Sequence, residues 1–526
     1  MLLLVLACAE APAPAAVDTL PPLDDARLLR RISLDLRGVT PSLEELEAVR
    51  AGPAALDALR DAFLVDPRLE DRLVSLWAER YRTRLDEFQV RWYDYQLPAE
   101  LECAFERAVG EEPLRLVAHI SVEDRPWSEV VTADYTMANE LLADLWPLAY
   151  PDGGAGWEEA RYTDGRPAAG VLATNGLWFR YYTSQSNANR SRAAALADVL
   201  LCVDYLDRPV TFSSSPSLAD ADGTATALAA DPACLACHAS IEPLAASLFG
   251  WYPAIDYNRL ELGTYHPERE ALGPEILGVD MGWFGTPMSS PDDLGPMVAS
   301  DPRFYACAVR GTAELLWRRE AAVDEFATLA ALEERFADGG WRARPLLAAV
   351  TDTPQYRAGG LGDAGDPRER TARLVSADVL TTAVEDLTGF RWSAGGCDQL
   401  ANDDYGYRTL VGGVDGDQVS RAQQDPSLTW ALVVERLAQG GAITAVQREL
   451  LDGGERRLFD VSIDTTPEDP AFRTQIERLY LRLFARLPSE SEVEEDVTLW
   501  RAAGDPGRGW TALLAVLLRD PEFVTQ

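Results

Sequence analysis

Cys234, Cys237 and His238 are the residues whose types and spacing best fit a defined chemistry, because they form a Cys-x-x-Cys-His motif. Two thiols at this spacing can add to the vinyl groups of a haem, and the adjacent imidazole is placed to ligate the iron. Residues 239–248 have a helix-like pattern, so both sulfurs and the imidazole can converge at one helix start. The motif therefore predicts covalent attachment of haem c, with His238 as an iron ligand.

Other interpretations of the motif remain open. A Cys-x-x-Cys redox pair is expected within a β-α-β pattern, and no such pattern surrounds these cysteines. A zinc site needs a fourth ligand, and no second Cys/His pair is visible in the sequence. The two cysteines can also form a structural disulfide or have no function of their own.

The second axial ligand of the iron would decide between an electron carrier and an enzyme, because a methionine thioether keeps the iron six-coordinate and raises its potential. The candidates after the motif are His266, Met281, Met288 and Met297. Met288 ends a Gly-Thr-Pro-Met sequence, which is similar to the distal Gly-Thr-x-Met of small cytochromes c, and Pro287 would stiffen that loop. We therefore expect Met288 as the metal ligand and Met281 as the second choice. If both methionines fill the core, the distal position is open or takes His266.

Helices are expected to position these residues, since amphipathic helical patterns are frequent and alternating strand patterns are few. Residues 191–203 and 430–438 show such patterns. The clearest apolar stripe repeats every three or four residues and comprises Ile476, Leu479, Tyr480, Leu483, Phe484 and Leu487. The sequence predicts a mainly α protein with several helical domains, one of which carries the cytochrome-c-like haem motif.

A degenerate repeat of helical hairpins appears near both ends of the chain. Residues 31–42 and 478–489 each form an amphipathic segment followed by Pro-Ser and acidic residues, which is a helix-start pattern. Each unit closes with an Asp-Pro step, at Asp66 and at Asp520, and a weaker middle copy covers 310–356. We interpret the repeat as architecture rather than as a site.

The length of 526 residues exceeds what one compact core usually holds, so two to four domains are expected. The expected segments are a signal at 1–8, a Pro/Ala-rich tether at 9–25, helical domains at 26–130 and 131–215, the haem-motif region at 216–310, a helical repeat at 311–360, a helical domain at 361–460 and a C-terminal repeat at 461–526.

The charge balance limits the kinds of partner. Forty-eight basic residues against 85 acidic ones give a net charge of −37, which repels nucleic acid and anionic membranes and favours a basic redox partner. Every basic residue is an arginine. We attribute the absence of lysine to codon bias in a GC-rich genome, with adaptation to high salt as the alternative.

The N-terminus resembles the end of a bacterial lipoprotein signal. An apolar run ends in Leu6-Ala7-Cys8, and the following Pro/Ala-rich stretch suits a flexible tether. No arginine precedes the apolar run, so the true start lies upstream or the segment is not a signal. We predict lipidation at Cys8, attachment to a membrane through that lipid alone, and a periplasmic or outer-membrane location.

The remaining four of the seven cysteines are Cys103, Cys202, Cys307 and Cys397. In an oxidising compartment they can form up to two disulfides, with three possible pairings. The alternative is that they are buried free thiols. The sequence does not choose between these possibilities.

Several stretches of the chain resemble a family, the planctomycete-type cytochrome-c-like proteins built of several domains of unknown function. The resemblance covers most of the chain in pieces. The matching pieces are 134–143, 170–172, Arg190, 200–202, 231–244, 301–304 with Cys307, and 373–389. The most specific piece is 231–244, where Glu242 replaces the aspartate of the family.

The resemblance implies an exported, haem-binding protein, but the family has no agreed reaction. We expect electron transfer in the cell envelope through a single haem c. One alternative is a haem enzyme, for example peroxidase-like, with an open distal position. The other alternative is a non-haem envelope scaffold in which the motif is vestigial. The three histidines, one assigned to iron, make a hydrolytic triad improbable.

Overall fold

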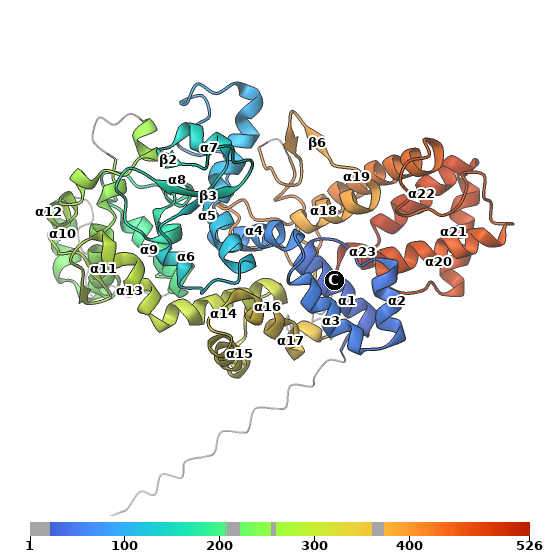
Figure 1. Cartoon of the computed structure of the whole chain (residues 1–526), viewed down its shortest axis with the longest axis horizontal. Helices are drawn as coiled ribbons and strands as arrows, with labels where there is room; N and C mark the ends of the chain where they lie inside the picture. Colours follow the sequence, from blue (N-terminus) through green and yellow to red (C-terminus); the bar gives the residue numbers. More distant parts are fainter. Residues whose placement is uncertain (1–21, 206, 208–220, 254–258, 360–372, 405) are drawn as a thin grey trace, which may run out of the picture.

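The computed structural model describes residues 22–205, 207, 221–253, 259–359, 373–404 and 406–526. Helices dominate these ranges, and the strands are few and short, so the prediction of a mainly α fold is confirmed. Figure 1 shows α8–α13 at one end of the long axis and α19–α22 at the other, with α4 between them. Cys8, the predicted signal and most of the predicted tether lie outside the described residues.

The first part of the chain packs around α5, a long and largely buried helix. Pro113 has no backbone N–H, so the carbonyl of Val109 lacks its hydrogen bond within α5. The backbone of Gly176 packs against this carbonyl so closely that no side chain would fit at position 176. The helices of this part are α1 (Asp25–Arg37), α2 (Leu43–Ala51), α3 (Ala54–Phe63), α4 (Arg68–Tyr81), α5 (Glu102–Val122), α6 (Glu129–Thr132), α7 (Glu140–Leu145), α8 (Asn175–Arg180) and α9 (Arg190–Leu201).

The described strands form one three-stranded sheet and two short hairpins, which are too small to make a separate layer of the fold. In the three-stranded sheet, β3 (Glu158–Tyr162) lies between β1 (Thr136–Ala138) and β2 (Leu148–Ala149), and both pairs are antiparallel. Two further hairpins pair β4 (Gly282–Trp283) with β5 (Thr286–Pro287) and β6 (Ser393–Ala394) with β7 (Cys397–Asp398).

The helices after α9 fall into two groups. The middle group comprises α10 (Ala221–Ala230), α11 (Pro232–Ala246), α12 (Leu272–Leu277), α13 (Leu294–Ser300), α14 (Pro302–Trp317), α15 (Phe326–Asp338), α16 (Ala343–Thr351) and α17 (Pro354–Arg357). The last group comprises α18 (Ala377–Thr388), α19 (Leu428–Ala445), which continues as a π-helix over Val446–Leu451, α20 (Pro470–Phe484), α21 (Glu490–Ala502), α22 (Pro506–Leu518) and α23 (Pro521–Val524).

Two large hydrophobic cores meet at α1. The larger core takes Leu29 and Ile32 from this helix and extends through α14 and α16, whereas Leu34 belongs to the core of α18–α23. The larger core thus draws on residues from five of the expected segments, the four from 26–130 to 311–360 and, through Ala485, 461–526. Because α1 contributes to both cores, it ties the two main parts of the protein together.

Two adjacent buried arginines of α1, Arg30 and Arg31, contact the last and the middle helical groups respectively. Arg30 donates to the carbonyls of Leu483, Phe523 and Thr525, at 2.7–2.8 Å. Arg31 donates to the carbonyl of Ala358 at 2.9 Å. Adjacent residues of α1 therefore form hydrogen bonds to the C-terminal parts of both the middle and the last helical group.

The predicted hairpin repeat corresponds to three similar helix successions. They are α1–α4, α14–α17 and α20–α23, and the first helix of each ends at a residue with positive φ. Ser42 and Ser489 form the predicted capping boxes with Glu45 and Glu492. The predicted apolar stripe is wrong at its end, because α20 stops at Phe484, the chain turns, and Leu487 is 46% exposed.

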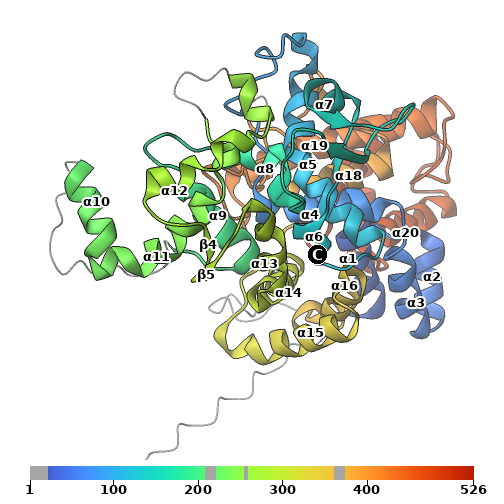
Figure 2. The ribbon, with the colours of Figure 1, turned by 60° about the vertical axis from the view of Figure 1, so that its left-hand side comes forward.

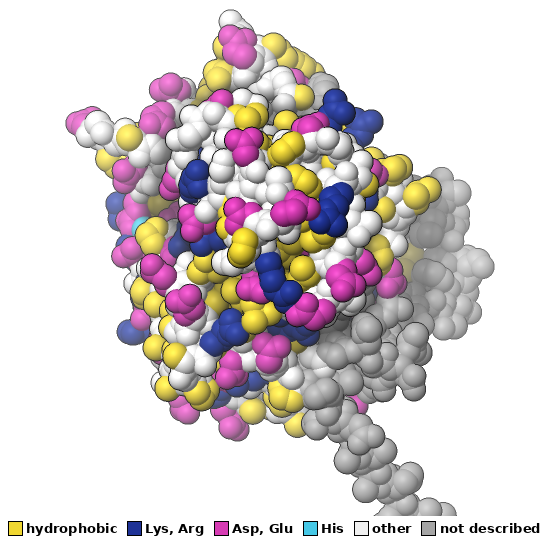
Figure 3. Space-filling model, turned by 90° about the vertical axis from the view of Figure 1, so that its right-hand side faces the viewer, with side chains coloured by type: hydrophobic (Ala, Val, Ile, Leu, Met, Phe, Trp, Pro, Cys, Tyr) yellow, Lys and Arg dark blue, Asp and Glu magenta, His cyan; other side chains and the backbone are white. Residues whose placement is uncertain are grey.

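The end face of the last helical group carries an apolar groove. Figure 3 shows hydrophobic side chains in the middle of this face, with acidic and arginine side chains around them. Ile443 and Leu451 are exposed there and line a groove of about 710 Å³ between α19 and α22. Among the described helices, none is long and apolar enough to cross a membrane.

Candidate functional site

The predicted motif lies on α11, near the N-terminus of that helix. Asp231 caps the helix, since its side chain accepts a hydrogen bond from the backbone of Ala233 at 2.8 Å, and Pro232 occupies the first helical position. The motif therefore lies near the start of a helix, as expected, and the helix begins at Pro232, before the first cysteine. Figure 2 shows α10 and the first half of α11 projecting from the body of the protein. The motif thus lies on an accessible part of the surface.

The two motif cysteines are unpaired and half-buried. They are three residues apart on one helix, so their side chains lie on one face of α11. The other described cysteines form two disulfides, Cys103–Cys397 and Cys202–Cys307. This is one of the three pairings that the sequence left open. Among the described cysteines, the free thiols are thus those of the Cys-x-x-Cys-His motif.

The imidazole of His238 is held by a carboxylate. Its Nδ1 lies 2.6 Å from Oε1 of Glu242, which follows one turn later on α11. The same carboxylate oxygen accepts a hydrogen bond of 2.6 Å from Nε of Arg190, the first residue of α9. The pairing occupies Nδ1 and leaves Nε2, the nitrogen opposite, as the one available to a metal.

Glu242 is suited to carry a negative charge next to the histidine. Burial raises the pKa of its carboxyl, but the hydrogen bonds from His238 and Arg190 outweigh burial, and the pKa is lowered overall. Its other oxygen, Oε2, is buried without a hydrogen-bond partner. The hydrogen bonds of this carboxylate are therefore those that its Oε1 makes with His238 and Arg190.

The predicted distal residues lie on the β4–β5 hairpin, which packs against α11. Met281 precedes β4 and Met288 follows β5, and the backbone amide of Met288 donates to the carbonyl of Met281 at 3.0 Å. Met288 is 7% exposed and belongs to the larger core, whereas Met281 is half-buried against that core. The hairpin therefore brings both methionines to the helix that carries His238.

His266, the other distal candidate, is engaged at both ring nitrogens. Its Nδ1 lies 3.1 Å from Glu268, and its Nε2 lies 3.2 Å from the carbonyl of Glu261. An imidazole with both nitrogens hydrogen-bonded has none left for a metal. This arrangement favours the methionines over His266 as distal ligand.

The residues of the motif fit a covalently bound haem. Cys234 and Cys237 offer two unpaired thiols on one helix face, and His238 offers a nitrogen whose partner nitrogen is already hydrogen-bonded. A haem bound here would supply a one-electron redox centre. In the described part of the chain, no three histidine, cysteine or acidic side chains are grouped so as to hold a metal ion by themselves.

Sequence reasoning missed the role of Glu242 and Arg190. The spacing of four residues between His238 and Glu242 was a usable signal, because residues four apart are neighbours on a helix. No sequence signal pairs Arg190 with Glu242, since the two come from different helices, α9 and α11.

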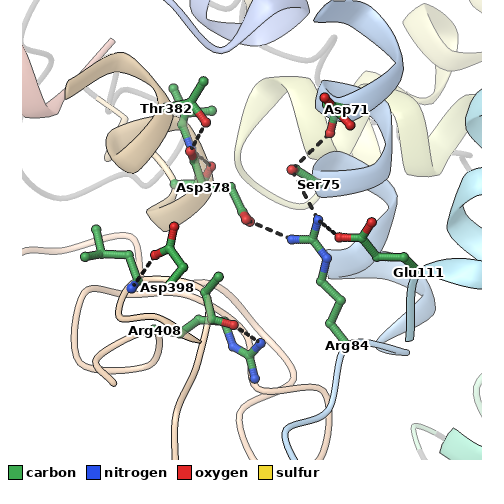
Figure 4. A network of polar contacts seen from close by, with 12 residues as sticks. Asp71, Ser75, Arg84, Glu111, Asp378, Thr382, Asp398 and Arg408 are labelled. Carbon is green, nitrogen blue, oxygen red and sulfur yellow. Dashed lines mark hydrogen bonds and ion pairs between the residues drawn. The ribbon is translucent and has the colours of Figure 1, made fainter. Parts of the chain in front are cut away.

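A second concentration of charge lies between the two main parts of the protein. Arg84 donates to Asp378 of α18 at 2.8 Å and to Glu111 of α5 at 3.2 Å (Figure 4). Burial raises the pKa of Glu111, but Arg84, Arg107 and Arg115 outweigh it and bring the pKa to about 2. The network borders a cavity of about 650 Å³, and its charges are paired with one another. We assign it to the junction between α5 and α18.

Comparisons with known protein families, with curated proteins and with solved structures gave no match.

Proposed function

We propose that this protein is an exported c-type haem protein of the kind expected from its resemblance to planctomycete cytochrome-c-like proteins, and that it transfers electrons in the cell envelope. The observation that carries the proposal is the state of Cys234, Cys237 and His238. The two thiols are unpaired on one face of α11, and the imidazole is held through Nδ1 with Nε2 available.

The disulfides support export. Two disulfides that join residues 294 and 105 positions apart are typical of proteins that fold in an oxidising compartment. In such a compartment an accessible pair of free thiols on one helix face is prone to oxidation unless another group takes it up. Thioether formation with a haem removes both thiols at once.

Each residue of the site has a defined part in this proposal. Cys234 and Cys237 bind the haem covalently, and His238 offers Nε2 to the iron. Glu242, held by Arg190, fixes the plane of the imidazole and makes it a more basic ligand. The proposed distal ligand is Met288, with Met281 as the second choice.

Denaturing gel electrophoresis followed by a stain for haem peroxidase activity tests the proposal. The protein should be produced with its own N-terminus in a host that attaches haem c in the periplasm. A stained band should appear at the full-length position for the wild type and vanish for the double variant Cys234→Ala, Cys237→Ala. An exported wild-type protein that stays unstained would exclude haem attachment and leave the scaffold alternative.

The second candidate function is a haem enzyme with an open distal position. The carboxylate partner of His238 favours it, because a more basic axial ligand pushes electron density to the iron and favours O–O cleavage. The burial of Met288 in the core is compatible with the same candidate. A wild-type ferric iron that is high-spin and binds cyanide readily would support the enzyme, whereas a low-spin, cyanide-resistant iron would support the carrier.

The proposed location and the proposed partner are based on the sequence. Lipidation of Cys8 would anchor the protein to an envelope membrane, and fractionation of the wild type against Cys8→Ser tests it, since equal solubility of the two would contradict the anchor. A net charge of −37 favours a basic redox partner. The rate of electron transfer to that partner should fall as salt rises, and a rate independent of salt would contradict the proposal.

A further inference from the structure

The Cys202–Cys307 disulfide has an arginine against both of its sulfurs. NH2 of Arg80, near the end of α4, lies 3.2 Å from Sγ of Cys202 and 3.4 Å from Sγ of Cys307. The same guanidinium also donates to the backbone carbonyl of Asp198. These contacts place a fixed positive charge at the disulfide.

The positive charge is only partly neutralised. Asp198 is the nearest carboxylate, 3.6 Å from Arg80 and 3.8 Å from Arg82. Of the other acidic residues nearby, Glu79 is paired with Arg318. Arg80 and Arg82 thus share the carboxylate of Asp198, and Arg80 is the cation in direct contact with the two sulfurs.

One of the two sulfurs can be approached from outside. Cys202, Arg80 and Arg82 border a cavity of about 820 Å³ that opens between α9 and α14. Cys202 is half-buried, whereas Cys307 is 4% exposed. An attacking group can therefore reach Cys202, and Cys307 is the sulfur that would leave.

We infer that Cys202–Cys307 is a redox-active disulfide that exchanges with a dithiol through the cavity beside Arg80. A thiolate of the dithiol attacks Sγ of Cys202 and forms a mixed disulfide, while the Cys202–Cys307 bond breaks and Cys307 leaves as a thiolate beside Arg80. The second thiol of the dithiol then attacks the mixed disulfide and releases Cys202. Two electrons pass from the dithiol, which becomes a disulfide, to the protein. One proton goes to solvent and one to Cys202.

Arg80 favours this exchange at two points. A cation next to a cysteine lowers the pKa of its thiol, and a thiol of lower pKa is a better leaving group. A stabilised thiolate also stabilises the reduced state, which makes the disulfide easier to reduce at equilibrium. Breaking the bond removes the covalent link between the C-terminal end of α9 and α14.

The other disulfide is a matched control within the same chain. Cys103–Cys397 also pairs a half-buried with a buried cysteine and also borders a cavity. In the described part of the chain its sulfurs have no arginine contact comparable to that of Arg80. The two disulfides thus differ in the arginine contact to their sulfurs and in the length of chain that they close, 105 positions for Cys202–Cys307 against 294 for Cys103–Cys397.

The full-length protein equilibrated in buffers of reduced and oxidised dithiothreitol tests the inference. Acid quenching, alkylation and peptide mass spectrometry then report the reduction of each disulfide separately. Cys202–Cys307 should be reduced at a lower ratio of reduced to oxidised dithiothreitol than Cys103–Cys397. Arg80→Gln should raise the ratio required by Cys202–Cys307 roughly tenfold and leave Cys103–Cys397 unchanged, whereas Arg80→Lys should retain most of the wild-type behaviour.

Equal midpoints of the two disulfides in the wild-type protein would overturn the inference, and so would a folded Arg80→Gln variant with an unshifted midpoint. If Arg80→Gln does not fold, the wild-type comparison alone decides. The readout does not depend on haem, so its result is separate from that of the proposed function.

Discussion

Oε1 of Glu242 lies 2.6 Å from Nδ1 of His238, one turn apart on α11. The carboxylate is buried, and Arg190 of α9 donates to the same oxygen. The orientation of the imidazole is thus set from within its own helix and fixed to a neighbouring helix. A histidine whose only role is to pack in the core has no need of such a charged pair.

Removing the charge of Glu242 should change the redox behaviour of the bound haem. Glu242→Gln keeps a hydrogen-bond acceptor of similar shape but no longer makes His238 a more basic ligand, so the midpoint potential should rise. A spectroelectrochemical titration measures it. The matched control is Glu268→Gln, which removes the carboxylate 3.1 Å from His266 and should leave the potential unchanged. Equal potentials of the wild type and Glu242→Gln would contradict the role of this carboxylate.

Replacement of Met288 should remove the distal ligand. Met288→Leu keeps the volume of a side chain that is 7% exposed, so the core stays filled while the sulfur is lost. The weak methionine-to-iron charge-transfer band should disappear and the potential should fall. Met297→Leu is the control and should keep the band. If the band is absent from the wild type or persists in Met288→Leu, Met288 is not the ligand.

Glu112 should make the stability depend on pH. Burial raises the pKa of this carboxyl from 4.5 to about 7, more than the hydrogen bonds from Gly176, Tyr162 and Thr136 lower it. Between these pH values the folded state holds the proton that the unfolded state has lost, so the free energy of unfolding falls as pH rises. The loss is about 3 kcal/mol between pH 4.5 and pH 7.

Urea denaturation at pH 5 and pH 8 measures this dependence. Glu112→Gln should keep the fold and show a smaller decrease in the free energy of unfolding than the wild type. An equal decrease in both proteins would show that another group is responsible, for example Glu106, the pKa of which burial raises to about 9.

Arg30 should be essential for joining the two cores. Arg30→Met would leave the buried carbonyls of Leu483, Phe523 and Thr525 without their donor, which should cost about 3 kcal/mol or more. Chemical denaturation measures the loss. Arg27→Met removes a side chain that is 41% exposed and should change the stability by less than about 1 kcal/mol. Similar losses in the two variants would contradict the assigned role.

Local sequence patterns predict where the helices lie. They do not predict where the chain turns back on itself. Periodicity placed the helix around Ile476 correctly but ran past its end, because Ala485 adopts a positive φ of 58° and turns the chain before Leu487. The helix of the motif was expected from the pattern of residues 239–248, and Asp231 and Pro232 start it before the first cysteine.

The candidate site was only partly predictable for the same reason. The thiols and the imidazole are adjacent in sequence, so their chemistry can be derived from spacing alone. The Cys103–Cys397 pairing joins α5 to β7 across 294 positions of sequence, so no local pattern could indicate it. Arg190 reaches Glu242 only because α9 packs on α11.

The most direct test of the central claim is a pyridine haemochrome spectrum, with the intact mass, of the wild-type protein exported by a host that matures c-type cytochromes. With haem attached at Cys234 and Cys237, the spectrum should show the absorption of a haem with both vinyl groups saturated, and the mass should increase by one haem per chain. Loss of both signals is expected when Cys234 and Cys237 are replaced by alanine. A colourless, folded protein with both disulfides formed and titratable thiols at Cys234 and Cys237 would contradict it.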